Sequence, residues 1–440
     1  MATDNESKVL GVVVFARHGD RQGFYQDPDT YTASSTVITP LGEQQEYQLG
    51  SLLRSVYFNA SAPTYIQGIA NETSLFQPTQ VIVRADAGDE GGVIYDILWG
   101  GYQYVPIESV EPNEDVSLEG FTSCNTFNDH TEAFYNSSAF QEKAKEVSQF
   151  LTDLKPYMDG RPVTLENMWN IFDYMNVQSI HNATFADSLP DTYLAQARDL
   201  ANWHEYNVFS DDSITGIGNI AFRTMLPSVI TAIQRISNSS DTLKLHYSAI
   251  AYKPFLSLFN MTGVVADGAL PPSIVNYAAA VVLEVRQSAS SPEPVLRFNF
   301  KNGTDDASFR TYSMSFAGWD GSADTDVPIS TFINAFQPAA VNTTLDWCHV
   351  CGQTQARGCA ALLGAASSSV QATTHHDRIS PVGAGFLGAG LTVAVFGAAF
   401  AVLLFLGYLT FGKGKRTSSR AKNDHLELHS SNNSVAKEAA

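Results

Sequence analysis

The chain has 440 residues, of which 44% are hydrophobic and 16% charged, and its formal charge is −19 at pH 7. Because phosphate backbones bind basic surfaces, this charge excludes a general nucleic-acid-binding protein. With 31 Gly and 18 Pro, the composition is that of a globular protein and excludes a collagen-like or disordered chain.

The first predicted elements are a buried strand, a helix and a second strand. Residues 9–16 form a continuous, valine-rich apolar run, which is typical of a strand buried on both faces of a sheet. Residues 39–58 have the apolar spacing of an amphipathic helix, and residues 80–83 predict a strand that ends at Arg84. This order of elements is typical of an α/β domain.

The middle of the chain has a different pattern. Between about residues 115 and 210, several segments carry apolar side chains three and four positions apart, and no strand pattern occurs. We therefore expect an all-helical cap inserted into the sheet domain. After it, residues 243–245 predict a short strand that ends at His246, and residues 277–286 and 295–300 predict a hairpin.

The C-terminal part predicts a membrane anchor. Residues 379–412 carry no charged side chain, and residues 383–410 are long enough to cross a hydrocarbon core of about 30 Å as one helix. The basic residues within 411–440 then mark the cytosolic side. We expect a single-pass protein of the cell surface or of a secretory or vacuolar membrane, with an extracellular or luminal N-terminal domain.

Glycosylation sequons and cysteines agree with this orientation. Eight Asn-x-Ser/Thr sequons occur, at Asn59, Asn71, Asn136, Asn182, Asn238, Asn260, Asn302 and Asn342. The four cysteines on the same side predict two disulfides in one of three pairings: Cys124, Cys348, Cys351 and Cys359. A zinc site is the alternative, but no second ligand pair follows the first, so no metal is predicted.

The N-terminus does not explain how this domain is exported. The apolar run before Arg17 is about eight residues long and leads directly into the most informative motif of the chain. Either the start of the gene is truncated or the protein is exported by a non-standard route.

That motif is Arg17-His18-Gly19-Asp20-Arg21, directly after the first buried strand. In an open α/β sheet, ligands bind beyond the carboxyl ends of the strands. Arginine forks pair with phosphate oxygens, and a neutral histidine nitrogen can attack phosphorus. The motif therefore predicts a phosphoryl-transfer site, and Arg84 and His246, each at a predicted strand end, are expected to join it.

The sequence at this point resembles the histidine acid phosphatase family, the cap-bearing branch of the phosphoglycerate-mutase-like superfamily, in its fungal form. The resembling segments are RHGDR (17–21), TPLGEQQEYQLGSLLRSVYF (39–58), VIVRADAGDEGGVIYDILWGG (81–101), TLENMWNIFDYM (164–175), LKLHYS (243–248) and VPISTFINAF (327–336).

The resemblance implies a three-layer α/β fold, with a mostly parallel central sheet and an inserted all-α cap, to which the chain adds its C-terminal transmembrane helix. We expect the following segments: a phosphatase ectodomain at 8–345 (core 8–110 and 211–345, cap 111–210), a Cys- and Ser-bearing stalk at 346–382, the transmembrane helix at 383–410, and a basic tail at 411–440.

The resemblance also implies a two-step hydrolysis of phosphomonoesters without metal or cofactor. His18 would be the nucleophile that forms a phosphohistidine, and His246 would complete the pocket. The phosphoryl oxygens would be held by Arg17, Arg21 and Arg84.

One departure from the family concerns the general acid. The family follows its second histidine with an acidic residue, whereas this chain has Tyr247, whose phenol is a weak acid. Asp20, Asp89 and Glu90 are the other candidate proton donors. Three hypotheses remain: a membrane-anchored phosphatase with a replaced acid, a pseudophosphatase that binds phosphate or phosphorylated ligands, and a surface adhesion glycoprotein that uses neither property.

Overall fold

The computed structural model describes residues 7–32, 36–70, 77–86, 105–266, 268–288, 292–321, 325–374 and 398. The chain divides into two compact units, residues 1–367 and residues 368–440. The fold and the site described below lie in the first unit.

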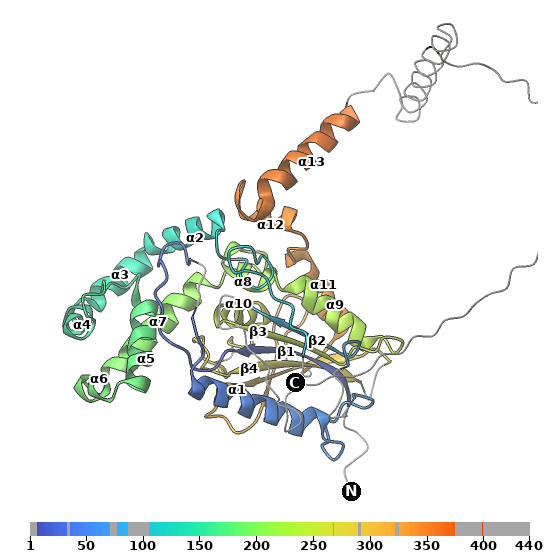
Figure 1. Cartoon of the computed structure of the whole chain (residues 1–440), viewed down its shortest axis with the longest axis horizontal. Coiled ribbons are helices and arrows are strands. Elements are labelled where there is room, and N and C mark those ends of the chain that lie inside the picture. The colour runs from blue at the N-terminus through green and yellow to red at the C-terminus, as the bar shows by residue number, and fades with distance from the viewer. Residues whose placement is uncertain are drawn as a thin grey trace, which may run out of the picture. The chain divides into compact units, whose positions relative to one another are not determined.

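A mixed sheet of seven strands forms the centre of this unit (Figure 1). The strand order is β2-β3-β1-β4-β5-β6, and β7 pairs with β5. The strands are β1 (Lys8–Arg17), β2 (Val81–Ala85), β3 (Leu245–Ile250), β4 (Ala280–Gln287), β5 (Val295–Lys301), β6 (Arg310–Tyr312) and β7 (Asp326–Pro328).

Only β2, β3 and β1 are parallel to one another, so the expectation of a mostly parallel sheet is wrong. The other four pairings, β1 with β4, β4 with β5, and β5 with both β6 and β7, are antiparallel. The physical reason is the short connection between β4 and β5, because parallel neighbours need a long crossover.

Helices cover both faces of the sheet, which makes three layers (Figure 1). On one face, α1 (Pro40–Leu53) packs through Leu49 and Leu53 against Val12 and Val14. On the other face lie α8 (Ile220–Arg223), α9 (Leu226–Ser237), α10 (Lys253–Thr262) and α11 (Ile329–Phe336). Successive residues of β1 alternate between the two apolar clusters, so β1 is buried on both faces, as its valine run predicts.

A second group of helices lies beside the sheet (Figure 1), and we call it the helical cap. It comprises α2 (Asn125–Tyr135), α3 (Ser138–Glu146), α4 (Ser148–Leu154), α5 (Met168–His181), α6 (Ala183–Ser188) and α7 (Tyr193–Val208). Within residues 109–244, all of which are described, no strand occurs. The ring of Tyr31 stacks on Trp169 at 4.8 Å between ring centroids, so the N-terminal loop is packed into the cap.

Two disulfides confirm the predicted use of the cysteines, and their pairing is Cys124–Cys351 and Cys348–Cys359. The expected stalk, however, does not begin at residue 346. Residues 344–350 form helix α12, in which Trp347 is fully buried and donates to the Gly120 carbonyl at 2.8 Å. Residues 346–359 are therefore part of the folded unit, because their disulfides and a buried indole attach them to it.

No helix in the described part of the chain combines the length and apolar character needed to cross a membrane. Except for Ala398, the predicted transmembrane helix and the basic tail lie outside the described residues.

Candidate active site

The RHGDR segment turns away from the sheet where β1 ends. Arg17 is the last residue of β1 and pairs with Ile250, the last residue of β3. The turn passes so close to the start of α1 that a Cβ atom on Gly19 would lie 2.3 Å from the Gly42 carbonyl oxygen. Glycine at this position is therefore required by the close approach of the two backbones.

His18 has a defined orientation. Its Nδ1 atom lies 2.7 Å from the Gly19 carbonyl oxygen, and its side chain is buried. A carbonyl can only accept a hydrogen bond, so Nδ1 carries the proton and Nε2 carries the lone pair. This is the tautomer in which Nε2 can act as a nucleophile.

A small cavity, which we name the His18 cavity, surrounds this imidazole. Its lining residues are Arg17, His18, Arg21, Phe24, Gln26, Trp169, Asn170, Phe172, Asp173, Tyr252, Lys253 and Ile274. They come from the RHGDR turn, from α5 of the cap, and from the segment that joins β3 to α10. The cavity thus lies beyond the carboxyl ends of β1 and β3, between the sheet and the cap.

Arg17 is buried between two aromatic rings. Its guanidinium carbon lies 5.2 Å from the ring centroid of Tyr252 and 4.5 Å from that of Tyr277, and Nη1 donates to the Val275 carbonyl. Burial lowers the pKa of Arg17. An arginine side chain is nevertheless a cation at physiological pH. Its Nε atom is buried without a hydrogen-bond partner among the described residues, so it is available to an acceptor in the cavity.

Arg21 connects the turn to the cap. Its Nη1 and Nη2 atoms donate to the two carboxylate oxygens of Asp173 at 3.2 and 2.9 Å. Asp173 belongs to α5 and is the single carboxylate among the described residues that line the His18 cavity. No sequence motif pointed to this aspartate.

Lys253 is a third cation of the cavity, and the sequence analysis missed it. Its Nζ atom donates to Gln26 Oε1 at 2.7 Å, and the side chain is 2% exposed. Aromatic rings surround it at 5.2–5.5 Å from Nζ, and no carboxylate of the described chain lies within ion-pair distance. Its place directly after β3, at the edge where ligands bind, was the signal that could have identified it.

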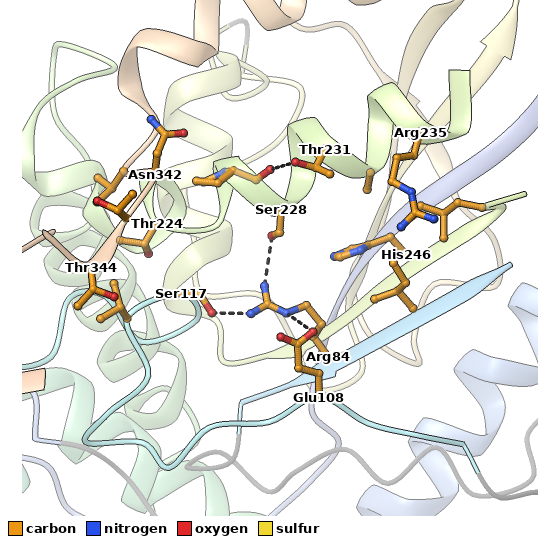
Figure 2. Close-up of a pocket in the computed structure, with 17 residues that line it drawn as sticks. Arg84, Glu108, Ser117, Thr224, Ser228, Thr231, Arg235, His246, Asn342 and Thr344 are labelled. Atoms are coloured by element: carbon orange, nitrogen blue, oxygen red, sulfur yellow. Dashed lines mark hydrogen bonds and ion pairs between the residues drawn. The ribbon is translucent and has the colours of Figure 1, made fainter. Parts of the chain in front are cut away.

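Arg84 and His246 do not line the His18 cavity. They lie together in a separate pocket of about 450 Å³ beside α9, where Arg84 donates to Ser117 Oγ and Ser228 Oγ at 2.6 and 3.2 Å (Figure 2). The expectation that the three strand ends converge on one pocket is therefore wrong for the residues that the structure describes.

The error for His246 lies in the strand boundary. β3 runs from Leu245 to Ile250, so His246 is near the start of this strand and pairs with Val13 and Ile82. The residues at the carboxyl end of β3, beside Arg17, are Ile250 and then Ala251. Burial, together with the charges of nearby arginines, lowers the pKa of His246 to about 4.

The predicted proton donors also lie away from the His18 cavity or outside the described residues. Asp20 accepts a hydrogen bond from Thr39 and lies 2.7 Å from His181 Nε2. Tyr247 belongs to the apolar cluster under α1, and burial together with the nearby carboxyl of Glu46 raises its pKa well above 10. Asp89 and Glu90 fall outside the described residues.

A second pocket of about 310 Å³ adjoins the His18 cavity, and we call it the outer pocket. The two share the lining residues Arg17, Phe172, Asp173 and Ile274. The outer pocket is also lined by Arg198, whose Nη2 donates to Asn276 Oδ1 at 2.5 Å. A ligand can therefore place one group beside His18 and extend into a larger, polar space.

Comparisons with known proteins agree with this architecture. No family model matches the chain. Human prostatic acid phosphatase is 23% identical over 301 residues, which cover 62% of this chain and 73% of the relative, and the mouse protein is 22% identical over the same length. Among solved structures, the phytases of Klebsiella sp. ASR1 and Citrobacter braakii align with TM-scores of 0.52 and 0.53 at 12% identity, covering 76% of this chain and 96% and 98% of theirs.

The chain is therefore similar in sequence to prostatic acid phosphatases, and it shares its α/β fold with the two phytases.

Proposed function

We propose that this protein hydrolyses phosphomonoesters in two steps, with His18 as the nucleophile that forms a phosphohistidine. The observation that supports this most directly is the 2.7 Å contact from His18 Nδ1 to Gly19 O. This contact leaves Nε2 as the lone-pair atom in a cavity that also contains Arg17 and Arg21. The acid phosphatases and phytases that this chain resembles agree with such a reaction.

The phosphoryl group would be bound by Arg17, Arg21 and Lys253. These three cations face one carboxylate, that of Asp173, so the cavity has a formal balance of +2. This balance complements a dianionic phosphomonoester in a chain whose overall charge would otherwise repel it. Arg84 and His246 have no part in this proposal.

Phosphate release from 4-nitrophenyl phosphate at pH 4–7 tests the proposal, with His18→Ala as the control. We expect turnover by the full chain and none by the variant, together with an acid-labile phosphoenzyme when a labelled substrate is quenched during turnover. Turnover that is unchanged in His18→Ala would contradict the proposal.

A pseudophosphatase is the second candidate, because apolar residues occupy the carboxyl end of β3. Ile250 and Ala251 lie there beside Arg17, and neither can donate a proton or a hydrogen bond from its side chain. In this case inorganic phosphate would bind in the cavity, as isothermal titration would detect, but no ester would be hydrolysed.

We further propose that the domain is anchored in a membrane by residues 383–410 and lies outside the cytosol. Two disulfides support an oxidising compartment. Five sequon asparagines are exposed and thus accessible to glycosylation, namely Asn59, Asn136, Asn182, Asn238 and Asn342. Carbonate extraction and a mobility shift after glycosidase treatment test the anchor and the compartment separately.

A further inference from the structure

Asp173 occupies a position that no other described carboxylate shares. It lines both the His18 cavity and the outer pocket, and its side chain is 15% exposed. A phosphoryl group beside His18 and a leaving group in the outer pocket would be joined by the ester oxygen. That oxygen must therefore lie where the two spaces meet, which is where Asp173 is found.

We propose that Asp173 is the general acid of the reaction, and that it protonates the leaving-group oxygen from the helical cap. This inference rests on the proposed phosphatase function. The proton donor would then belong to the cap. The carboxyl end of β3 does not supply one, because the side chains of Ile250 and Ala251, which lie there, carry no acidic group.

The other described candidates are less suitable for geometric reasons. Asp20 lies outside both pockets, held by Thr39 and His181. Tyr247 packs in the apolar cluster between α1 and the sheet, and it lines neither pocket. Asp305 lines the outer pocket but not the His18 cavity, so it does not reach the junction of the two spaces.

The bond between Asp173 and Arg21 is compatible with this role. Arg21 uses both of its terminal nitrogens to hold the carboxylate. A phosphoryl group competes with Asp173 for these donors, and it brings further negative charge into a small cavity. A dianionic phosphoryl group and a carboxylate that compete for the same guanidinium favour the uptake of one proton, which the carboxyl group can then donate.

The proposed steps balance as follows. His18 Nε2 attacks phosphorus, the bond from phosphorus to the ester oxygen breaks, and the leaving oxygen takes the proton of the Asp173 carboxyl group. The alcohol departs and Asp173 is left as a carboxylate. It then accepts a proton from the water that attacks the phosphohistidine, the bond from phosphorus to nitrogen breaks, and inorganic phosphate is released with both side chains restored.

The test compares two leaving groups in the full chain. The 4-nitrophenolate of 4-nitrophenyl phosphate is a good leaving group and departs without protonation. The alkoxide of an alkyl phosphate such as glycerol 2-phosphate is a poor leaving group, so its oxygen must be protonated by an acid. We expect Asp173→Asn to lower kcat for the alkyl ester by about 10²- to 10⁴-fold and kcat for the aryl ester by less than about 10-fold. The amide oxygen of Asn can still accept a hydrogen bond from Arg21. If Asp173→Asn fails to fold, Asp173→Ser is tested in its place.

Two matched variants control for charge. Asp187→Asn removes an exposed carboxylate of the cap that lines neither pocket. Asp20→Asn removes the carboxylate of the RHGDR motif, and both variants should retain the wild-type ratio of alkyl to aryl turnover. An equal loss on both esters in Asp173→Asn, or an alkyl-specific loss in Asp20→Asn, would overturn the assignment of Asp173. Wild-type protein that hydrolyses neither ester would instead refute the proposed function itself, and the assignment with it.

Discussion

The guanidinium of Arg21 donates two hydrogen bonds to the carboxylate of Asp173, at 3.2 and 2.9 Å between heavy atoms. One residue follows the first strand of the sheet and the other belongs to α5 of the helical cap. Both side chains are largely buried, at 3% and 15% exposure. The same pair therefore joins the cap to the RHGDR turn, and because it is neutral, the +2 balance of the His18 cavity comes from Arg17 and Lys253.

Arg21→Lys should impair substrate binding more than it impairs folding. Lysine retains the charge but lacks the planar fork that holds two oxygens at once. We expect KM for 4-nitrophenyl phosphate to rise about 10-fold, since one charge-assisted hydrogen bond is worth about that factor. Arg310→Lys is the matched control, because Arg310 is exposed and lines neither pocket. An unchanged KM in Arg21→Lys would show that Arg21 does not bind the phosphoryl group.

Lys253→Met tests the third cation of the cavity. Methionine has a similar length and suits an aromatic environment, so the substitution removes the charge with little change in packing. We expect the inhibition constant of inorganic phosphate to rise about 10- to 100-fold, which is the range for loss of a hydrogen bond to a charged group.

The control for this substitution is Lys145→Met, at an exposed lysine of α3. Its inhibition constant should equal that of the wild type. Equal phosphate inhibition in Lys253→Met and the wild type would mean that Lys253 contributes only to the packing of the cap.

His246→Asn should leave catalysis nearly unchanged. His246 lies in the pocket beside α9 with Arg84, and not in the His18 cavity (Figure 2). We expect kcat/KM within about threefold of the wild type, whereas His18→Ala should show no turnover. A loss of 100-fold or more in His246→Asn, with an unchanged melting temperature, would return His246 to the catalytic site.

The sequence predicted the parts of the site that are local in the chain. The valine run and the RHGDR motif are contiguous, so their burial and their position after a strand follow from residue order alone. The prediction ends β3 at His246, four residues before its end at Ile250, because LKLHYSAIA is apolar on both sides of His246 and periodicity does not locate a boundary inside such a run. Asp173 was not predicted at all, since it reaches the site only through the packing of the cap on the sheet.

Glu46 gives the stability of this protein a distinct dependence on pH. This glutamate of α1 is buried near Gly19 and Tyr247, and burial raises its pKa from 4.5 to about 8, opposed by a hydrogen bond from the Gly19 backbone. Between these two values the folded protein retains a proton that the unfolded chain releases. The contribution of Glu46 to stability is therefore fully present below pH 4.5 and is lost as the pH rises to about 8.

Glu46→Gln isolates this contribution, because the amide is neutral at every pH. We expect the variant and the wild type to have free energies of unfolding within about 1 kcal/mol of each other at pH 4.5, where the carboxyl group is also neutral in the folded state. At pH 8 the variant should be more stable by a few kcal/mol, since only the wild type must either bury a charge or keep its proton against the solution. Urea denaturation of both proteins at the two pH values measures the difference. A difference that is the same at both pH values would mean that Glu46 titrates in the folded protein as it does in the unfolded chain.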